Sequence, residues 1–159
     1  AYRALKAYKK ALEDYSYVVL ITGNSDAYYN RGEFYLSVNY YQKANDDFNR
    51  SIKLNKNNSF SYFYRGTTYL LLGKYNEAIL DFSKALKFDS TDFDAMLGLA
   101  LAYGMNNDFN RAKLNLEKAK TILSTNKTDD KDLKLFEKTY WYQNQNYVFS
   151  KIYKELIKR

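Results

Sequence analysis

Residues 59–92 read SFSYFYRGTTYLLLGKYNEAILDFSKALKFDSTD, and this stretch decides the fold of the chain. In its first half, Tyr62, Gly66 and Tyr69 are spaced four and three residues apart. In its second half, large and small side chains follow the same helical spacing at Tyr75, Ala78, Phe82 and Ala85. Rings that alternate with small residues on one face of a helix let a second helix approach closely. The stretch therefore predicts two short helices.

The same pattern occurs on both sides of this stretch, and every position is displaced by the same offset. Residues 25–58 carry it at Tyr28, Gly32, Tyr35, Tyr41, Ala44, Phe48 and Ser51. Residues 93–126 carry it at Met96, Ala100, Tyr103, Phe109, Ala112, Leu116 and Ala119. A fixed period with no insertion between units is the signature of a repeat array.

The units resemble tetratricopeptide repeats, whose period is about 34 residues and whose unit is a helix–turn–helix. The resemblance covers residues 25–126, and residues 1–24 resemble the second half of a unit. Tyr or Met stands where the family usually has Trp. The proline that usually ends a unit is replaced by Lys56, Ser90 and Ser124, so we expect polar capping at these junctions. The resemblance implies an all-α fold, a right-handed superhelical solenoid of antiparallel helix hairpins.

We expect one repeat domain over the whole chain, residues 1–159. Its parts are a half-repeat helix (1–24), three repeats (25–58, 59–92 and 93–126) and a degenerate helix pair (127–159). Terminal repeats need a polar outer face, and the last pair carries one, so we interpret it as a cap. Trp141 is expected to pack against the preceding pair.

The composition excludes several kinds of chemistry. The chain has no cysteine and no histidine, which removes disulfides, thiol catalysis and the commonest general base and metal ligand. The remaining acidic clusters stand at helix starts or on helix surfaces, where Asp is a routine cap. We therefore expect no enzyme activity, no cofactor and no metal site. No apolar run is long enough to span a membrane.

The formal charge of +7 makes nucleic acid a second possible partner. The C-terminal third is rich in lysine, but acidic residues are interspersed and arginine is scarce. Arginine is the residue best suited to phosphate and base recognition. The pattern favours a solvated lysine surface over a nucleic-acid site.

A pair of charged residues recurs in the first two repeats and disappears from the third. Arg31 and Asp47 occupy the same repeat positions as Arg65 and Asp81, and Leu99 and Asn115 replace both together. Joint loss predicts that the Arg and Asp of one unit pair across its two helices. Unrelated surface charge is the alternative.

The resemblance implies a binding site on the free face of the first helices, which lines the concave groove of the family. The groove residues of this chain are then Tyr29, Asn30, Glu33, Phe60, Phe63, Tyr64, Thr67, Leu71, Leu97 and Leu101. We interpret Tyr29, Phe63 and Tyr64 as the best candidates, because rigid rings give large contact area at low entropy cost. Some family members clamp an acidic tail with lysines here, and Glu33 disfavours that mode.

The predicted function is a non-catalytic protein–protein interaction scaffold or adaptor that binds a peptide or partner helix with apolar or aromatic side chains. A basic nucleic-acid-associated adaptor and a regulatory or anchoring module of a larger protein are the alternatives, and self-association is compatible with the pattern. The chain begins at Ala1 in mid-pattern without an initiating Met. We interpret it as a processed fragment, from which an upstream signal or anchor could have been removed. The sequence does not determine the compartment, although it slightly favours the cytoplasm.

Overall fold

The computed structural model describes residues 2–124 and, beyond them, residues 137, 139, 140, 143, 150, 153–155 and 158. The capping pair expected at 127–159 lies outside the described residues except at those positions. The expected packing of Trp141 also lies outside them.

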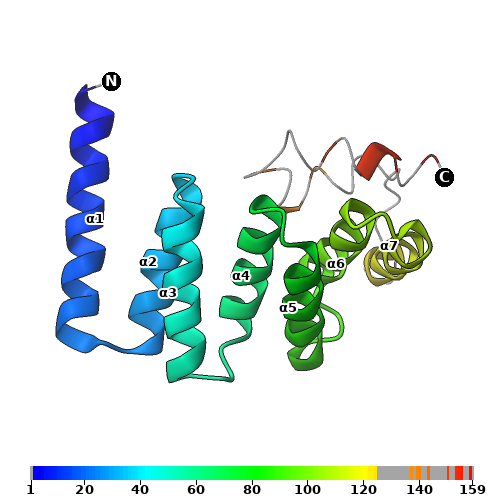
Figure 1. Cartoon of the computed structure of the whole chain (residues 1–159), viewed down its shortest axis with the longest axis horizontal. Coiled ribbons are helices and arrows are strands. Elements are labelled where there is room, and N and C mark those ends of the chain that lie inside the picture. The colour runs from blue at the N-terminus through cyan, green and yellow to red at the C-terminus, as the bar shows by residue number, and fades with distance from the viewer. Residues whose placement is uncertain are drawn as a thin grey trace. The chain divides into compact units, whose positions relative to one another are not determined.

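Every regular element in residues 2–124 is an α-helix, which confirms the all-α fold class (Figure 1). The helices are α1 (Tyr2–Thr22), α2 (Ser25–Ser37), α3 (Tyr41–Leu54), α4 (Ser59–Leu71), α5 (Tyr75–Phe88), α6 (Phe93–Met105) and α7 (Phe109–Ser124). The first helices of successive pairs begin at Ser25, Ser59 and Phe93, each of which opens one repeat of the sequence. Helix boundaries therefore follow the period of the sequence.

Each first helix begins at an Asn or Asp side chain. Asn24, Asn58 and Asp92 accept a hydrogen bond from the backbone N–H three residues later, at 2.8, 3.2 and 3.0 Å. These side chains satisfy one of the N–H groups that a helix start leaves without a partner. Asn58 and Asp92 thus provide polar capping at the junctions after Lys56 and Ser90, and the junction after Ser124 lies outside the described residues.

The turn inside each pair contains one residue in the left-handed region of backbone conformation. These residues are Asn39 (φ 65°), Gly73 (φ 74°) and Asn107 (φ 62°), which occupy the same position in their repeats. Glycine adopts this conformation without steric penalty, and asparagine tolerates it better than most residues. The residue choice in the turns therefore follows the backbone that a tight helix hairpin needs.

The chain forms two compact units, Ala1–Leu72 and Gly73–Arg159. The boundary falls between the two helices of the repeat at 59–92. Unit 1 contains α1 to α4 and unit 2 contains α5 to α7. Within unit 1, α2 packs against α1 and α3, and α3 also packs against α4; within unit 2, α6 packs against α5 and α7.

The core of unit 1 depends on a glycine and a ring. Ala44 and Phe48 of α3 are fully buried. A Cβ atom added to Gly32 of α2 would lie 2.8 Å from the Phe48 ring, closer than non-bonded atoms can approach. Gly32 therefore lets α2 lie directly against Phe48.

The core of unit 2 surrounds α6, which is apolar on all faces. Its residues Leu97, Gly98, Leu99, Ala100, Leu101 and Ala102 are all buried. A helix that is hydrophobic all round must be covered on all sides. Asp94 of α6 also accepts a hydrogen bond from the backbone N–H of Tyr140, at 3.2 Å, so at least this point of the C-terminal part lies against α6.

A chain of three serine hydroxyls crosses the interior of unit 1. Ser51 Oγ of α3 lies 2.9 Å from Ser25 Oγ of α2 and 2.7 Å from Ser61 Oγ of α4. All three side chains are buried. We call this chain the serine ladder; its hydroxyls satisfy one another where water is excluded.

The C-terminal half of α1 exposes apolar side chains. Tyr17, Leu20 and Ile21 are 62%, 81% and 60% exposed. Their spacing of three and four residues places them on one face of the helix. None of the helices in the described part of the chain is long and apolar enough to cross a membrane.

Candidate functional site

Four of the ten predicted groove residues come together in unit 1. Tyr29 and Glu33 are one turn apart on α2, and Phe60 and Tyr64 are one turn apart on α4. The i, i+4 spacing places each pair on one helix face. We call these four residues the Tyr29 cluster.

The rings of the cluster are in contact. The Tyr29 ring centroid lies 5.7 Å from that of Tyr64 and 6.2 Å from that of Phe60. Phe48 of α3 lies beneath both tyrosines, with its centroid 6.3 Å from Tyr29 and 6.0 Å from Tyr64. Tilted and offset rings at these separations attract one another. The buried Phe48 ring therefore holds the two tyrosine rings in place.

The cluster is open to solvent on one side. Phe60 is 66% exposed, while Tyr29, Glu33 and Tyr64 are half-buried. Asn30, also predicted as a groove residue, is exposed beside them. The cluster thus offers an aromatic surface whose inner part is rigid and whose rim is accessible.

The Tyr29 hydroxyl has an unusual electrostatic environment. Its pKa is raised well above the ordinary value, first by burial and then by the neighbouring Tyr64 and by the Glu33 carboxylate. Burial and negative charge both disfavour the phenolate. Tyr29 is therefore neutral over the physiological range and acts as a hydroxyl and a ring, with a carboxylate close by.

Other predicted groove residues have little or no exposed surface. Phe63 is 7% exposed, and Thr67 of α4 is fully buried, with its hydroxyl donating to the Phe63 carbonyl at 3.0 Å. Leu97 and Leu101 of α6 are also fully buried, because α6 is covered on all faces. Leu71 is half-buried. Burial removes four of the ten positions from the surface that a partner can reach in this structure.

The opposite face of α2 carries the predicted Arg–Asp pair. Arg31 donates to both carboxylate oxygens of Asp47, from Nε at 2.7 Å and from a terminal nitrogen at 2.8 Å. This confirms the pair in the first repeat. The guanidinium also lies 5.8 Å from the ring centroids of both Tyr28 and Tyr35. Sequence reasoning missed these ring contacts, although Tyr28 and Tyr35 flank Arg31 at helical spacing.

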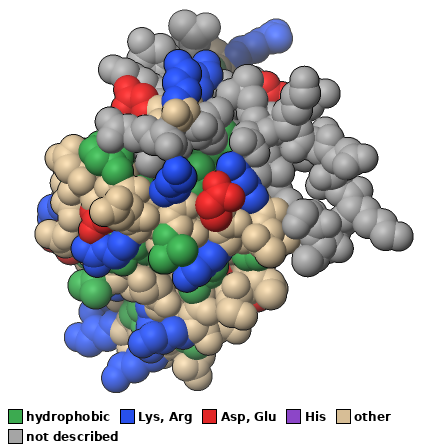
Figure 2. Space-filling view, turned by 90° about the vertical axis from the view of Figure 1, so that its right-hand side faces the viewer, with side chains coloured by type: hydrophobic (Ala, Val, Ile, Leu, Met, Phe, Trp, Pro, Cys, Tyr) green, Lys and Arg blue, Asp and Glu red, His purple; other side chains and the backbone are tan. Residues whose placement is uncertain are grey.

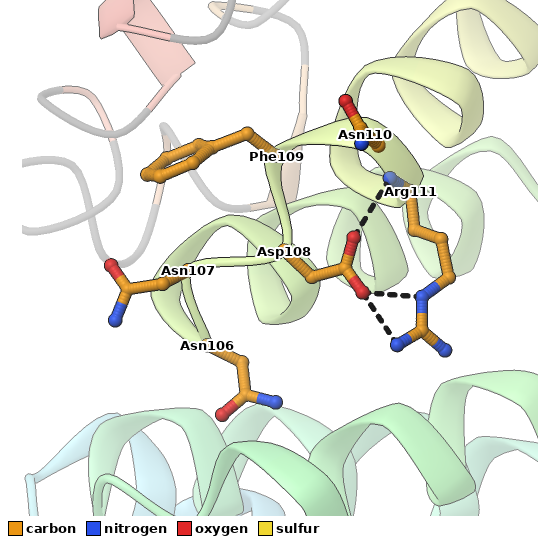
Figure 3. A pocket seen from close by; sticks show the side chains of 6 residues that line it. All are labelled: Asn106, Asn107, Asp108, Phe109, Asn110 and Arg111. Atoms are coloured by element: carbon orange, nitrogen blue, oxygen red, sulfur yellow. Dashed lines mark hydrogen bonds and ion pairs between the residues drawn. The ribbon is translucent and has the colours of Figure 1, made fainter.

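A shallow polar hollow of about 650 Å³ lies at the turn between α6 and α7, lined by residues 106–111 (Figure 3). Arg111 folds back on Asp108 there and its guanidinium lies 4.6 Å from the Tyr103 ring centroid. The pKa of Asp108 is held below its usual range, first by the Arg111 backbone N–H and then by its side chain. Because the Asp108 and Arg111 charges neutralise each other, the hollow offers little net charge to attract a ligand.

Metal and nucleic-acid chemistry find no support in the described residues. That part of the chain contains no group of three acidic, His or Cys side chains able to hold a metal ion. On the face shown in Figure 2, Lys and Arg side chains are scattered among hydrophobic and acidic ones. A dense basic stripe would be needed to follow a phosphate backbone.

Comparison with known families identifies the repeats. Two tetratricopeptide repeat profiles match residues 25–58 and residues 59–92. The chain contains tetratricopeptide repeats. The boundaries of both matches agree with the helix starts at Ser25 and Ser59. No curated protein sequence matches it.

Solved structures share this fold. A crystal structure of MamA is 16% identical, with a TM-score of 0.73, and the match covers 98% of this chain and 90% of that one. YrrB, described as a tetratricopeptide repeat protein with an unusual peptide-binding site, is 16% identical, with a TM-score of 0.69 and coverage of 98% and 77%. The second repeat domain of human RPAP3, in complex with the HSP70 peptide SGPTIEEVD, is 25% identical, with a TM-score of 0.56 and coverage of 58% and 78%.

Proposed function

We propose that this tetratricopeptide repeat protein is a non-catalytic scaffold that binds an extended peptide or a partner helix across α2 and α4 of unit 1. The Tyr29 cluster is the centre of the site, with Asn30 and Leu71 at its rim. The partner contributes apolar or aromatic side chains. The observation that carries this proposal is the group of touching rings, of which Phe60 is 66% exposed.

The physical argument starts from the energetics of exposed rings. A ring that is two-thirds exposed on a rigid surface gains free energy when a partner covers it, at about 25 cal/mol for each Å² of apolar area buried. The Tyr29 and Tyr64 rings of the cluster already pack against Phe48, so binding orders few side chains. A preformed surface lowers the entropic cost of association. Interface residues that dominate affinity are enriched in aromatic side chains of this kind.

Two solved structures support a peptide as the class of partner. The RPAP3 domain is in complex with a peptide, and YrrB is described by its peptide-binding site. The RPAP3 ligand contains two glutamates and one aspartate. Glu33 gives the surface of this chain the opposite preference, because like charges repel across an interface. We therefore propose that the peptide bound by this chain is not acidic where it meets Glu33.

The test is a selection of peptides from a displayed library of random dodecapeptides, followed by affinity measurement. Phe60→Ala should weaken the selected peptides by about tenfold, typical of an aromatic contact residue. Leu80→Ala is the matched control, because Leu80 is 70% exposed on α5 and belongs to unit 2 rather than to the cluster. Selection of no peptide, or equal affinity losses in the two variants, would contradict the proposal.

A further inference from the structure

We propose that the Tyr29 cluster binds the guanidinium group of an arginine side chain carried by the partner peptide. This inference rests on the proposed function, since it names the side chain that the same surface selects. The cluster combines aromatic rings with a carboxylate, and the described residues place no cation at Glu33 or over the Tyr29 ring.

The carboxylate of Glu33 has no ion-pair partner among the described residues. Arg31, Arg111 and Lys120 form ion pairs there, and each of these cations is paired with another carboxylate. Glu33 lies one helical turn after Tyr29 on α2, on the same helix face, and its carboxylate contributes to the raised pKa of the Tyr29 hydroxyl. The negative charge and the ring surface therefore belong to one site.

The chain itself shows what such a site accepts. On the opposite face of α2, the Arg31 guanidinium lies 5.8 Å from the ring centroids of Tyr28 and Tyr35 and pairs with Asp47. Ring faces attract cations, and arginine is the more frequent partner. Two tyrosines and a carboxylate are thus already occupied by a guanidinium within unit 1. The Tyr29 cluster offers the same kinds of group, and no guanidinium of the described residues pairs with its carboxylate.

Unit 2 repeats this chemistry with one ring. The Arg111 guanidinium lies 4.6 Å from the Tyr103 ring centroid and pairs with Asp108. The combination of tyrosine, carboxylate and guanidinium is therefore a recurring arrangement in this chain.

Desolvation argues against the other occupants. A purely apolar side chain placed over Tyr29 and Tyr64 would also cover part of the Glu33 carboxylate, and burying an unpaired charge is unfavourable. An acidic side chain would add repulsion to that penalty. A guanidinium covers the rings with its flat face and donates hydrogen bonds to the carboxylate at the same time.

The experiment is a double-mutant cycle on peptides selected from the random dodecapeptide library. Each selected peptide is synthesised with arginine and with citrulline, which keeps the shape of the side chain but has no charge. Both forms are titrated calorimetrically against the wild-type chain, Glu33→Gln and Glu13→Gln. Glu13 is an exposed glutamate of α1 in the same unit, so Glu13→Gln controls for the change in net charge. Thermal melting by circular dichroism checks that each variant is folded.

We expect citrulline to weaken binding to the wild-type chain and to Glu13→Gln by about tenfold, which corresponds to about 1.4 kcal/mol. Against Glu33→Gln the same replacement should weaken binding less than about twofold, because the carboxylate that pairs with the guanidinium is already absent. The effects of two groups in direct contact are not additive. Selected peptides without arginine, or an equal effect of citrulline on all three proteins, would overturn this inference and leave the scaffold function intact. Failure to select any peptide would overturn both.

Discussion

Replacing Arg31 with leucine tests whether the Arg31–Asp47 pair holds α2 against α3. The two side chains are 20% and 8% exposed, and two hydrogen bonds join them. Arg31→Leu removes both bonds and leaves the Asp47 carboxylate enclosed. The third repeat has leucine and asparagine at these positions, so Arg31→Leu/Asp47→Asn installs a combination that the same fold already uses.

The magnitude follows from the burial of Asp47. Breaking a fully buried pair by removing one partner costs about 3–5 kcal/mol. The Arg31 side chain keeps some exposure, which lets water reach the remaining carboxylate, so we expect about 2–4 kcal/mol for Arg31→Leu. In the third repeat, Leu99 is 7% exposed and the Asn115 amide donates to the Arg111 carbonyl at 2.8 Å. The double variant should therefore recover about 1–3 kcal/mol of that loss.

The assay is urea unfolding followed by circular dichroism, with free energies of unfolding compared for the wild type, both single variants and the double variant. The coupling between the two substitutions measures the pair. A double variant no more stable than Arg31→Leu would refute the reasoning, because the loss would then come from the ring contacts of Arg31 rather than from an unpaired carboxylate.

Two further predictions concern the helix contacts. Gly32→Ala should lower the urea midpoint, because a Cβ atom would lie 2.8 Å from the fully buried Phe48 ring. The overpacking cost of about 1–3 kcal/mol should exceed the gain of about 1 kcal/mol in helix propensity. A raised midpoint would contradict this. Burial raises the pKa of Asp92, so the wild type gains stability as pH falls through that raised pKa. Asp92→Asn, which keeps the cap without the charge, should therefore match or exceed wild-type stability at pH 7 and lose this advantage in acid; a pH-independent difference would count against it.

The fold was predictable from the sequence because the same pattern of large and small residues recurs in each repeat. Size classes recur at one fixed interval, and the helix starts recur at the same interval. The Arg31–Asp47 pair was also predictable, since the joint replacement by Leu99 and Asn115 indicates a contact. Comparison between repeats can therefore predict a contact within one repeat when both contacting residues are replaced together in another.

The exposure of the candidate groove residues was harder to predict from the sequence. Spacing places Leu97 and Leu101 on the same helix face as Tyr29, but their burial depends on how neighbouring helices cover α6. A hydrophobic pattern on every face of residues 93–105 was the signal that this helix is enclosed. The contact between the Tyr29 and Tyr64 rings depends on side-chain rotamers and on the distance between α2 and α4, which no spacing rule supplies.

The serine ladder has a consequence for how the array can be rearranged. The residues one period after Ser51 and Ser61 are Ala85 and Ala95, both buried in unit 2. If the first repeat were joined directly to the third, Ala95 would replace Ser61, and Ser51 would keep Ser25 but lose its second hydroxyl partner. The cost should be below the about 1–3 kcal/mol of a buried hydroxyl with no partner at all. The serine junction of unit 1 and the alanine junction of unit 2 are therefore not interchangeable, so the stability of the interfaces depends on the order of the repeats.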